Sequence, residues 1–141
     1  MSEEKKVPTR PLPKLDELDT AEFWRATKNK EFRYQQCINC ESIVWHPRAH
    51  CTGCVDSNLQ WQTSAGQGVI YSYSIVRLSY HPFFRGKAPY AVAYVDLDEG
   101  PRFLTNVVGV DEPGTDVRIG QRVQLHWEEH EELSIPLVTP V

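Results

Sequence analysis

Two pairs of cysteines constrain this chain more than any other feature of its sequence. All four cysteines fall within 18 residues in the pattern C-x2-C-x10-C-x2-C, and they are Cys37, Cys40, Cys51 and Cys54. Each CxxC turn brings two thiolates close enough to share one metal ion, and two such turns complete a tetrahedron of sulfur ligands. Four soft thiolates favour zinc, with rubredoxin-type iron as the chemical runner-up. The sequence therefore predicts one four-cysteine metal site.

A closed site of this kind is structural rather than catalytic. Four protein ligands leave no open position for a bound water, so hydrolysis at the metal is not expected. The metal instead supplies folding free energy to a segment too short to bury a core of its own. His46 and His50 lie between the two pairs and could replace a ligand, although four cysteines already fill the coordination sphere.

The sequence carries no sign of export or of membrane insertion. Residues 1–6 are mostly charged and lack the apolar stretch of a signal peptide. No run of about 18 apolar residues could span a membrane. We therefore expect a cytoplasmic protein, in which thiols stay reduced and CxxC pairs indicate a metal rather than disulfides.

The chain divides into four expected segments. Residues 1–18 mix charges with three prolines and predict a disordered or extended arm. Residues 19–30 predict an N-terminal helix, which the D-x-x-E spacing of Asp19 and Glu22 opens as a capping box. Residues 31–66 form the zinc ribbon and residues 67–141 a β barrel.

Five segments of the C-terminal half have the composition of strands. Alternation of polar and apolar residues over 122–128 is typical of a strand with one wet face, and residues 98–100 predict a hairpin turn. Five antiparallel strands in so short a chain favour a small closed barrel of the OB-fold type, with an SH3-like barrel as the main alternative. The fold class expected is mainly β: a helix, a rubredoxin-like zinc ribbon, then a five-stranded OB-fold barrel. The predicted strands cover residues 68–78, 90–97, 101–108, 122–128 and 134–138.

The distribution of charge argues against nucleic acid as the partner. The barrel half, residues 67–141, carries six Lys and Arg against ten Asp and Glu. A nucleic-acid-binding protein needs a basic face because neutralised phosphates supply most of its affinity. Tyrosines of the barrel could stack on bases, but the acidic balance disfavours that function.

No credible catalytic set emerges from the sequence. His126 to His130 matches H-x-x-E-H, a zinc-protease motif that needs both histidines on one face of a helix, whereas this segment alternates like a strand. Asp96, Asp98 and Glu99 cluster at the predicted hairpin tip, which explains them better than an acid/base pair does. The default interpretation is a binding or scaffold protein.

Two aromatic segments are candidates for contact with a partner. Phe23 and Trp24 lie on the apolar side of the predicted helix, and they either pack on their own domain or dock on another subunit. Phe83 and Phe84 lie in the loop 81–89 between the first two barrel strands, where they either cap the barrel or form a partner-binding edge.

The same loop offers a second interpretation. Arg85 and Lys87 follow the two phenylalanines, and their positive charges could bind an anionic ligand such as a CoA phosphate.

Beyond the cysteines, a series of short motifs recurs in one order in a known family. From about residue 20 to its end, the chain resembles the family once called domain of unknown function thirty-five, acyl-CoA-associated proteins with a rubredoxin-like zinc ribbon and an OB-fold. Two positions depart from the family pattern, since Glu41 replaces a common glycine and Thr52 a frequent proline, but neither removes a metal ligand. The motifs are Phe23-Trp24, Pro47-Arg48, Gly66-x-Gly68-x-Ile70-Tyr71-Ser72, Pro89 to Ala93, Asp96 to Arg102, Asn106 to Gly109 and Ile119-Gly120.

This resemblance implies a function. Such proteins are usually partners of thiolase-superfamily enzymes, bridging a thiolase to hydroxymethylglutaryl-CoA synthase or completing lipid-transfer-protein-like aldolases that shorten acyl-CoA side chains, including those of steroids. The partner carries the catalytic residues and holds most of the acyl-CoA. We therefore expect a non-catalytic accessory subunit in a hetero-oligomer, with an aldolase partner preferred over a true thiolase. A free-standing acyl-CoA-binding protein and a single-stranded nucleic-acid-binding OB protein are the alternatives.

Overall fold

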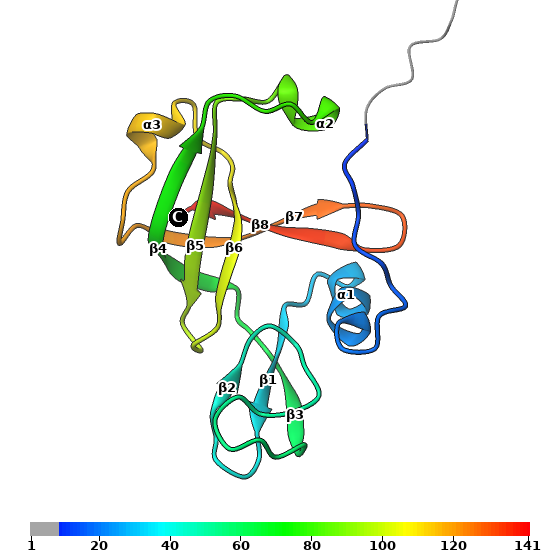
Figure 1. The fold of residues 1–141 in the computed structure, drawn as a ribbon. Coiled ribbons are helices and arrows are strands. Elements are labelled where there is room, and N and C mark those ends of the chain that lie inside the picture. Colours follow the sequence, from blue (N-terminus) through cyan, green and yellow to red (C-terminus); the bar gives the residue numbers. More distant parts are fainter. Residues whose placement is uncertain (1–8) are drawn as a thin grey trace, which may run out of the picture.

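The computed structural model describes residues 9–141 as a small three-stranded sheet and a closed five-stranded barrel, with a helix beside both (Figure 1). The small sheet has the order β2-β1-β3, and the barrel closes in the order β4-β5-β6-β8-β7. The predicted mainly β fold is thereby confirmed. The elements are α1 (Ala21–Lys28), β1 (Arg33–Cys37), β2 (Ile43–Val44), β3 (Leu59–Thr63), β4 (Gln67–Val76), α2 (Pro82–Arg85), β5 (Tyr90–Leu97), β6 (Arg102–Val107), α3 (Pro113–Asp116), β7 (Arg122–Glu129) and β8 (Ser134–Pro140).

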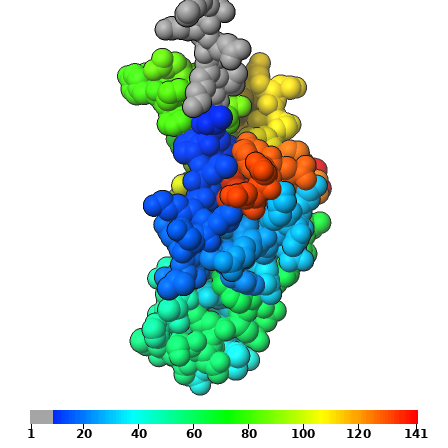
Figure 2. Space-filling view, turned by 90° about the vertical axis from the view of Figure 1, so that its right-hand side faces the viewer, coloured from blue at the N-terminus to red at the C-terminus, as the bar shows by residue number. Residues whose placement is uncertain are grey.

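The arm predicted over residues 1–18 lies partly outside the described chain, because the description begins at residue 9. Residues 9–18 form no helix or strand. They run along the surface beside the β7–β8 hairpin and lead into α1, as the blue segment in Figures 1 and 2 shows. This part of the arm is therefore draped over its own chain.

Helix α1 begins without the capping box that the sequence suggested, so that prediction is wrong. Thr20 is the N-cap residue, and no side chain accepts a hydrogen bond from the helix N-terminus. Glu22 instead forms an ion pair with Arg33 of β1. A contact with a neighbouring element has replaced the local cap. Of the helices within residues 9–141, none has the length and apolarity needed to cross a membrane.

One aromatic cluster joins the helix, the ribbon and the barrel. The ring of Phe23 in α1 meets those of Phe32 and Trp45 edge-on, with centroids 5.1 and 5.0 Å away. Phe32 in turn lies 4.8 Å from Phe103 of β6. Edge-to-face packing of this kind adds about 1 kcal/mol per pair to the gain from burial. Phe23 is only 3% exposed, so its ring serves the core of its own chain.

Two sets of strand pairings close the barrel. The long strand β4 pairs with β5 from Gly68 to Val76, with a register shift between Ile70 and Ser72, and it pairs with β7 at its start. Strands β6 and β8 meet in parallel at one pair, Val107 and Val138. Next to that pair the Thr105 hydroxyl donates a hydrogen bond to the carbonyl of Pro136 at 2.6 Å. The Thr105 side chain thus links β6 to β8, where the two strands share a single backbone pair.

Candidate metal centre and junction pocket

Two turns of matching geometry hold the four cysteines together in the ribbon. In each turn, the residue after the second cysteine donates its N–H to the carbonyl of the first. These bonds run from Glu41 to Cys37 at 2.9 Å and from Val55 to Cys51 at 3.1 Å. Glu41 and Val55 both have positive φ, 64° and 67°.

The positive φ of Glu41 fits the glycine that the family resemblance implies at this position. The left-handed region costs a non-glycine residue about 1 kcal/mol. The hydrogen bond to Cys37 is made all the same, so the departure from the family pattern leaves the turn intact.

The sulfur atoms have the spacing of a tetrahedral site. Cys37 and Cys54 lie 3.6 Å apart at Sγ, Cys40 and Cys51 lie 3.5 Å apart, and all four Sγ atoms fall within 4.8 Å of one another. A tetrahedron with Zn–S distances of about 2.3 Å has S···S edges of about 3.8 Å. The four cysteines are thus positioned for metal binding. Within residues 9–141, neither His46 nor His50 belongs to this cluster.

The surroundings of the sulfurs shift the pKa values of two of the thiols in opposite directions. Hydrogen bonding to Ser42 lowers the pKa of the Cys40 thiol to about 6. The N–H of Cys40 also lowers the pKa of Cys37, but burial and contact with the Cys54 thiol outweigh it and raise that pKa to about 11. Gly53 N–H points at the sulfur of Cys51 at 3.2 Å. Backbone N–H groups aimed at sulfur are what a bound thiolate needs to offset its charge.

The residues that superficially suggest catalysis have structural partners. Glu129, the glutamate of the H-x-x-E-H motif, ends strand β7 and forms an ion pair with Lys30 at 3.1 Å, so the motif is not on a helix. Its neighbour Glu128 contacts His130 at 2.7 Å. At the β5–β6 hairpin, Asp96 pairs with Arg102 and Asp98 with Arg122. Glu99 accepts hydrogen bonds from the linker between ribbon and barrel.

The loop that carries the two phenylalanines contains the short helix α2 and is stabilised internally. Phe83 and Phe84 are half-buried and meet edge-on at 4.9 Å. The ammonium of Lys87 lies 4.7 Å from the centre of the Phe83 ring, and Arg85 donates to the carbonyl of Tyr80. Both cations proposed for a CoA phosphate therefore already have a partner within the loop.

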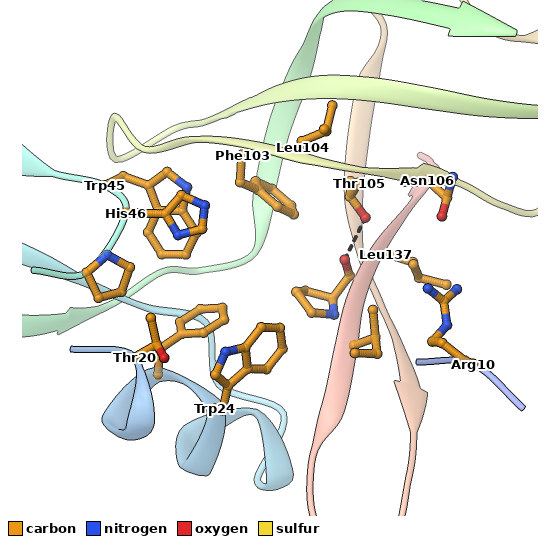
Figure 3. Close-up of a pocket in the computed structure, with 14 residues that line it drawn as sticks. Arg10, Thr20, Trp24, Trp45, His46, Phe103, Leu104, Thr105, Asn106 and Leu137 are labelled. Carbon is orange, nitrogen blue, oxygen red and sulfur yellow. Dashed lines mark hydrogen bonds between the residues drawn. The ribbon is translucent and has the colours of Figure 1, made fainter. Parts of the chain in front are cut away.

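A pocket of about 250 Å³, which sequence reasoning missed, lies at the junction of helix, ribbon and barrel. Figure 3 shows Trp45 and His46 at one end of it, Arg10 with Asn106 at the other, and Trp24 between the two ends. The imidazole of His46 stacks on Trp45 at 5.0 Å. These side chains come from segments far apart in the sequence, so no local motif could have indicated the pocket.

Comparison with known families matches most of the chain in two adjoining parts. The model of the ChsH2 rubredoxin-like zinc ribbon domain matches residues 24–60, and that of the ChsH2 C-terminal OB-fold domain matches residues 61–128. The predicted zinc ribbon and OB-fold are both confirmed, and the SH3-like alternative is excluded.

Two curated relatives and one solved structure are similar to the chain. A probable enoyl-CoA hydratase alpha subunit of Thermomonospora curvata is 34% identical over 99% of this chain, which spans only 42% of that relative's length. A DUF35 domain-containing scaffold protein of Methanothermobacter thermautotrophicus is 28% identical over 76% of this chain and 80% of its own length. A chain of the Ltp2-ChsH2(DUF35) aldolase structure is 34% identical, with a TM-score of 0.80 over 93% of this chain and 98% of that one.

Proposed function

Because this chain belongs to the ChsH2 family, whose members join a rubredoxin-like zinc ribbon to an OB-fold, we propose that it is a non-catalytic accessory subunit of a thiolase-superfamily enzyme acting on acyl-CoA. The partner reaction we favour is the cleavage of a carbon–carbon bond by a lipid-transfer-protein-like aldolase in the degradation of acyl-CoA side chains, such as those of steroids. A thiolase complex is the second choice.

One observation carries this proposal: the similarity to a chain from an aldolase assembly over nearly the whole length of both chains. The relative named as a scaffold protein supports an accessory role, and the relative named as a hydratase subunit supports acyl-CoA chemistry. The aspartates and the glutamate of the β5–β6 hairpin are taken up by structural contacts, which also favours a supporting role.

The four cysteines would hold a structural Zn²⁺ ion. The metal would supply folding free energy to the ribbon, whose own buried cluster is small: Cys37, Val44 and Cys51. In this role Cys37, Cys40, Cys51 and Cys54 fix the shape of the ribbon and take no part in the partner's reaction.

The surface that meets the partner would include the aromatic side chains that remain accessible. Trp24 in α1 and Phe83 and Phe84 in the α2 loop are half-buried and lie at the surface, whereas Phe23 lies inside the core. Half-buried aromatic side chains are typical anchors of protein interfaces.

The direct test is co-expression of the tagged chain with a candidate thiolase-like aldolase from the same organism. We expect one gel-filtration peak containing both proteins, and an acyl-CoA aldolase activity that depends on the complex. Two separate peaks, with full activity of the partner alone, would contradict the proposal.

The alternatives predict different results for the isolated chain. Tight binding of a CoA thioester in calorimetry without a partner would favour a free-standing acyl-CoA-binding protein. Salt-dependent binding to a single-stranded oligonucleotide would favour nucleic-acid binding.

A further inference from the structure

Among residues 9–16, Arg10 is the only one whose side chain forms a hydrogen bond or an ion pair with the rest of the described chain. Its Nε atom lies 2.6 Å from Oε2 of Glu128, and its Nη2 atom donates to Oε1 at 3.3 Å. The Arg10 side chain is 14% exposed and that of Glu128 28%. Only Nη2 makes a hydrogen bond, since the buried Nε makes none despite its short distance to Oε2. An ion pair that is partly shielded from water is stronger than a fully exposed one.

The same guanidinium also contacts the α2 loop. Its carbon Cζ lies 5.2 Å from the centre of the Phe83 ring and 5.1 Å from that of Phe84, within range of a cation–π interaction. Arg10 therefore joins three segments: the arm, strand β7 and the loop that carries the two phenylalanines.

Arg10 stands between two neighbouring cavities. The junction pocket of about 250 Å³ and a second one of about 300 Å³ beside the α2 loop share Arg10, Asn106 and Leu137 in their walls. Figure 3 shows Arg10 near both of these residues, at the end of the junction pocket away from Trp45.

We propose that residues 9–18 are a releasable strap fixed by Arg10, and that its release joins the two cavities into one groove along β6 and β8. The other side chains of the strap are less buried than Arg10 or only partly buried: Leu12 is 46% exposed and Leu18 96% exposed, and Pro13 and Leu15 are half-buried. Figure 2 shows the strap lying on the surface between the α2 loop and α1. Release also frees the rings of Phe83 and Phe84 from the guanidinium, so one contact controls both the groove and the loop.

The test compares the full-length wild-type chain with Arg10→Ala and Glu128→Gln, which break the ion pair from opposite sides. Amide hydrogen exchange reports on the α2 loop, where Phe84 and Arg85 both donate to the carbonyl of His81. We expect this exchange to be at least about ten-fold faster in both variants, because the free energy contributed by a hydrogen bond to a charged group is large enough for a change of that size. Limited tryptic cleavage after Lys14, an exposed residue of the strap, should accelerate by a similar factor.

Lys14→Ala is the matched control for exchange, because it removes one positive charge from the strap and leaves the Arg10–Glu128 ion pair intact. Its α2 exchange should equal that of the wild type. Binding of the fluorescent apolar probe 1-anilinonaphthalene-8-sulfonate should increase in Arg10→Ala and Glu128→Gln and stay unchanged in Lys14→Ala. If Arg10→Ala and Glu128→Gln both showed the wild-type rates of α2 exchange and of cleavage after Lys14, the proposal would be overturned. The experiment uses the isolated chain, so its outcome does not depend on whether the proposed partner protein exists.

Discussion

The hydroxyl of Thr27 in α1 accepts a hydrogen bond at 3.1 Å from the backbone N–H of Ser134, the first residue of β8. The two residues are 107 positions apart and both are buried. The same hydroxyl donates to the carbonyl of Trp24 at 2.6 Å, so it serves as donor and acceptor at once. This contact fixes the helix against the barrel at the point where the last strand begins.

Replacing Thr27 by valine should therefore destabilise the protein. The two side chains have nearly the same shape, but Thr27→Val leaves the buried N–H of Ser134 without an acceptor, at a cost of about 1–3 kcal/mol. Thr27→Ser keeps the hydroxyl and should lose only about 1 kcal/mol for the missing methyl group. Urea denaturation of the three proteins measures the difference. A valine variant as stable as the serine variant would mean that the bond contributes nothing.

Glu99 should control the rigidity of the link between ribbon and barrel. Its carboxylate accepts hydrogen bonds from the Ser64 hydroxyl at 2.6 Å and from the N–H of Ala65 at 2.7 Å. Glu99→Ala removes both, and we expect the free energy of unfolding to fall by about 1–3 kcal/mol and the Ala65 amide to exchange faster. Glu131→Ala, which removes an exposed carboxylate from the β7–β8 turn, is the control and should change neither. Equal exchange at Ala65 in both variants would contradict the role of Glu99.

Gly68 marks the point where the barrel closes, and a side chain there should not be tolerated. A Cβ atom at this position would clash with the carbonyl oxygen of Asp96 and lie 3.0 Å from the Cα of Leu97, both rigid backbone atoms of β5. We expect Gly68→Ala to destabilise the fold by about 3 kcal/mol or more, since overpacking forces the backbone to shift. Gly86→Ala is a matched control, because a Cβ atom there would have no neighbouring atom within 4 Å and the φ of −83° suits alanine. Thermal unfolding of the two variants compares them directly, and equal melting temperatures would refute the clash.

The parts of this structure that the sequence predicts well are those encoded by neighbouring residues. The metal site depends on two CxxC turns, and strand β7 on an alternation within one segment, so both could be inferred directly. The predicted capping box was wrong because Glu22 pairs with Arg33 in the next element, and the spacing of neighbouring residues cannot reveal such a contact. The junction pocket and the Arg10 anchor combine segments more than 100 residues apart, so they depend on the closed barrel being in place.

The ribbon should depend on its metal for folding, and Cys37 provides the sharpest test. Cys37 is 1% exposed, and its sulfur lies 3.6 Å from that of Cys54, at the buried side of the cluster. Cys37→Ser replaces a soft thiolate by a hydroxyl that binds zinc poorly, and structural zinc sites contribute about 10 kcal/mol or more of apparent binding energy. We expect loss of the metal, loss of the ribbon's exchange protection and failure to form the complex with the proposed partner. None of the partner's own catalytic groups would be changed.

Metal analysis separates this effect from general misfolding. The wild-type chain should carry one zinc ion and lack the visible absorbance of an iron–thiolate centre, and a strong chelator should lower its melting temperature. His46→Ala and His50→Ala are the controls, because both histidines lie in the ligand loop yet outside the sulfur cluster, and both variants should keep the metal. If Cys37→Ser folded, retained a full complement of zinc and bound its partner as the wild type does, the four-cysteine site could not be the structural centre of the ribbon.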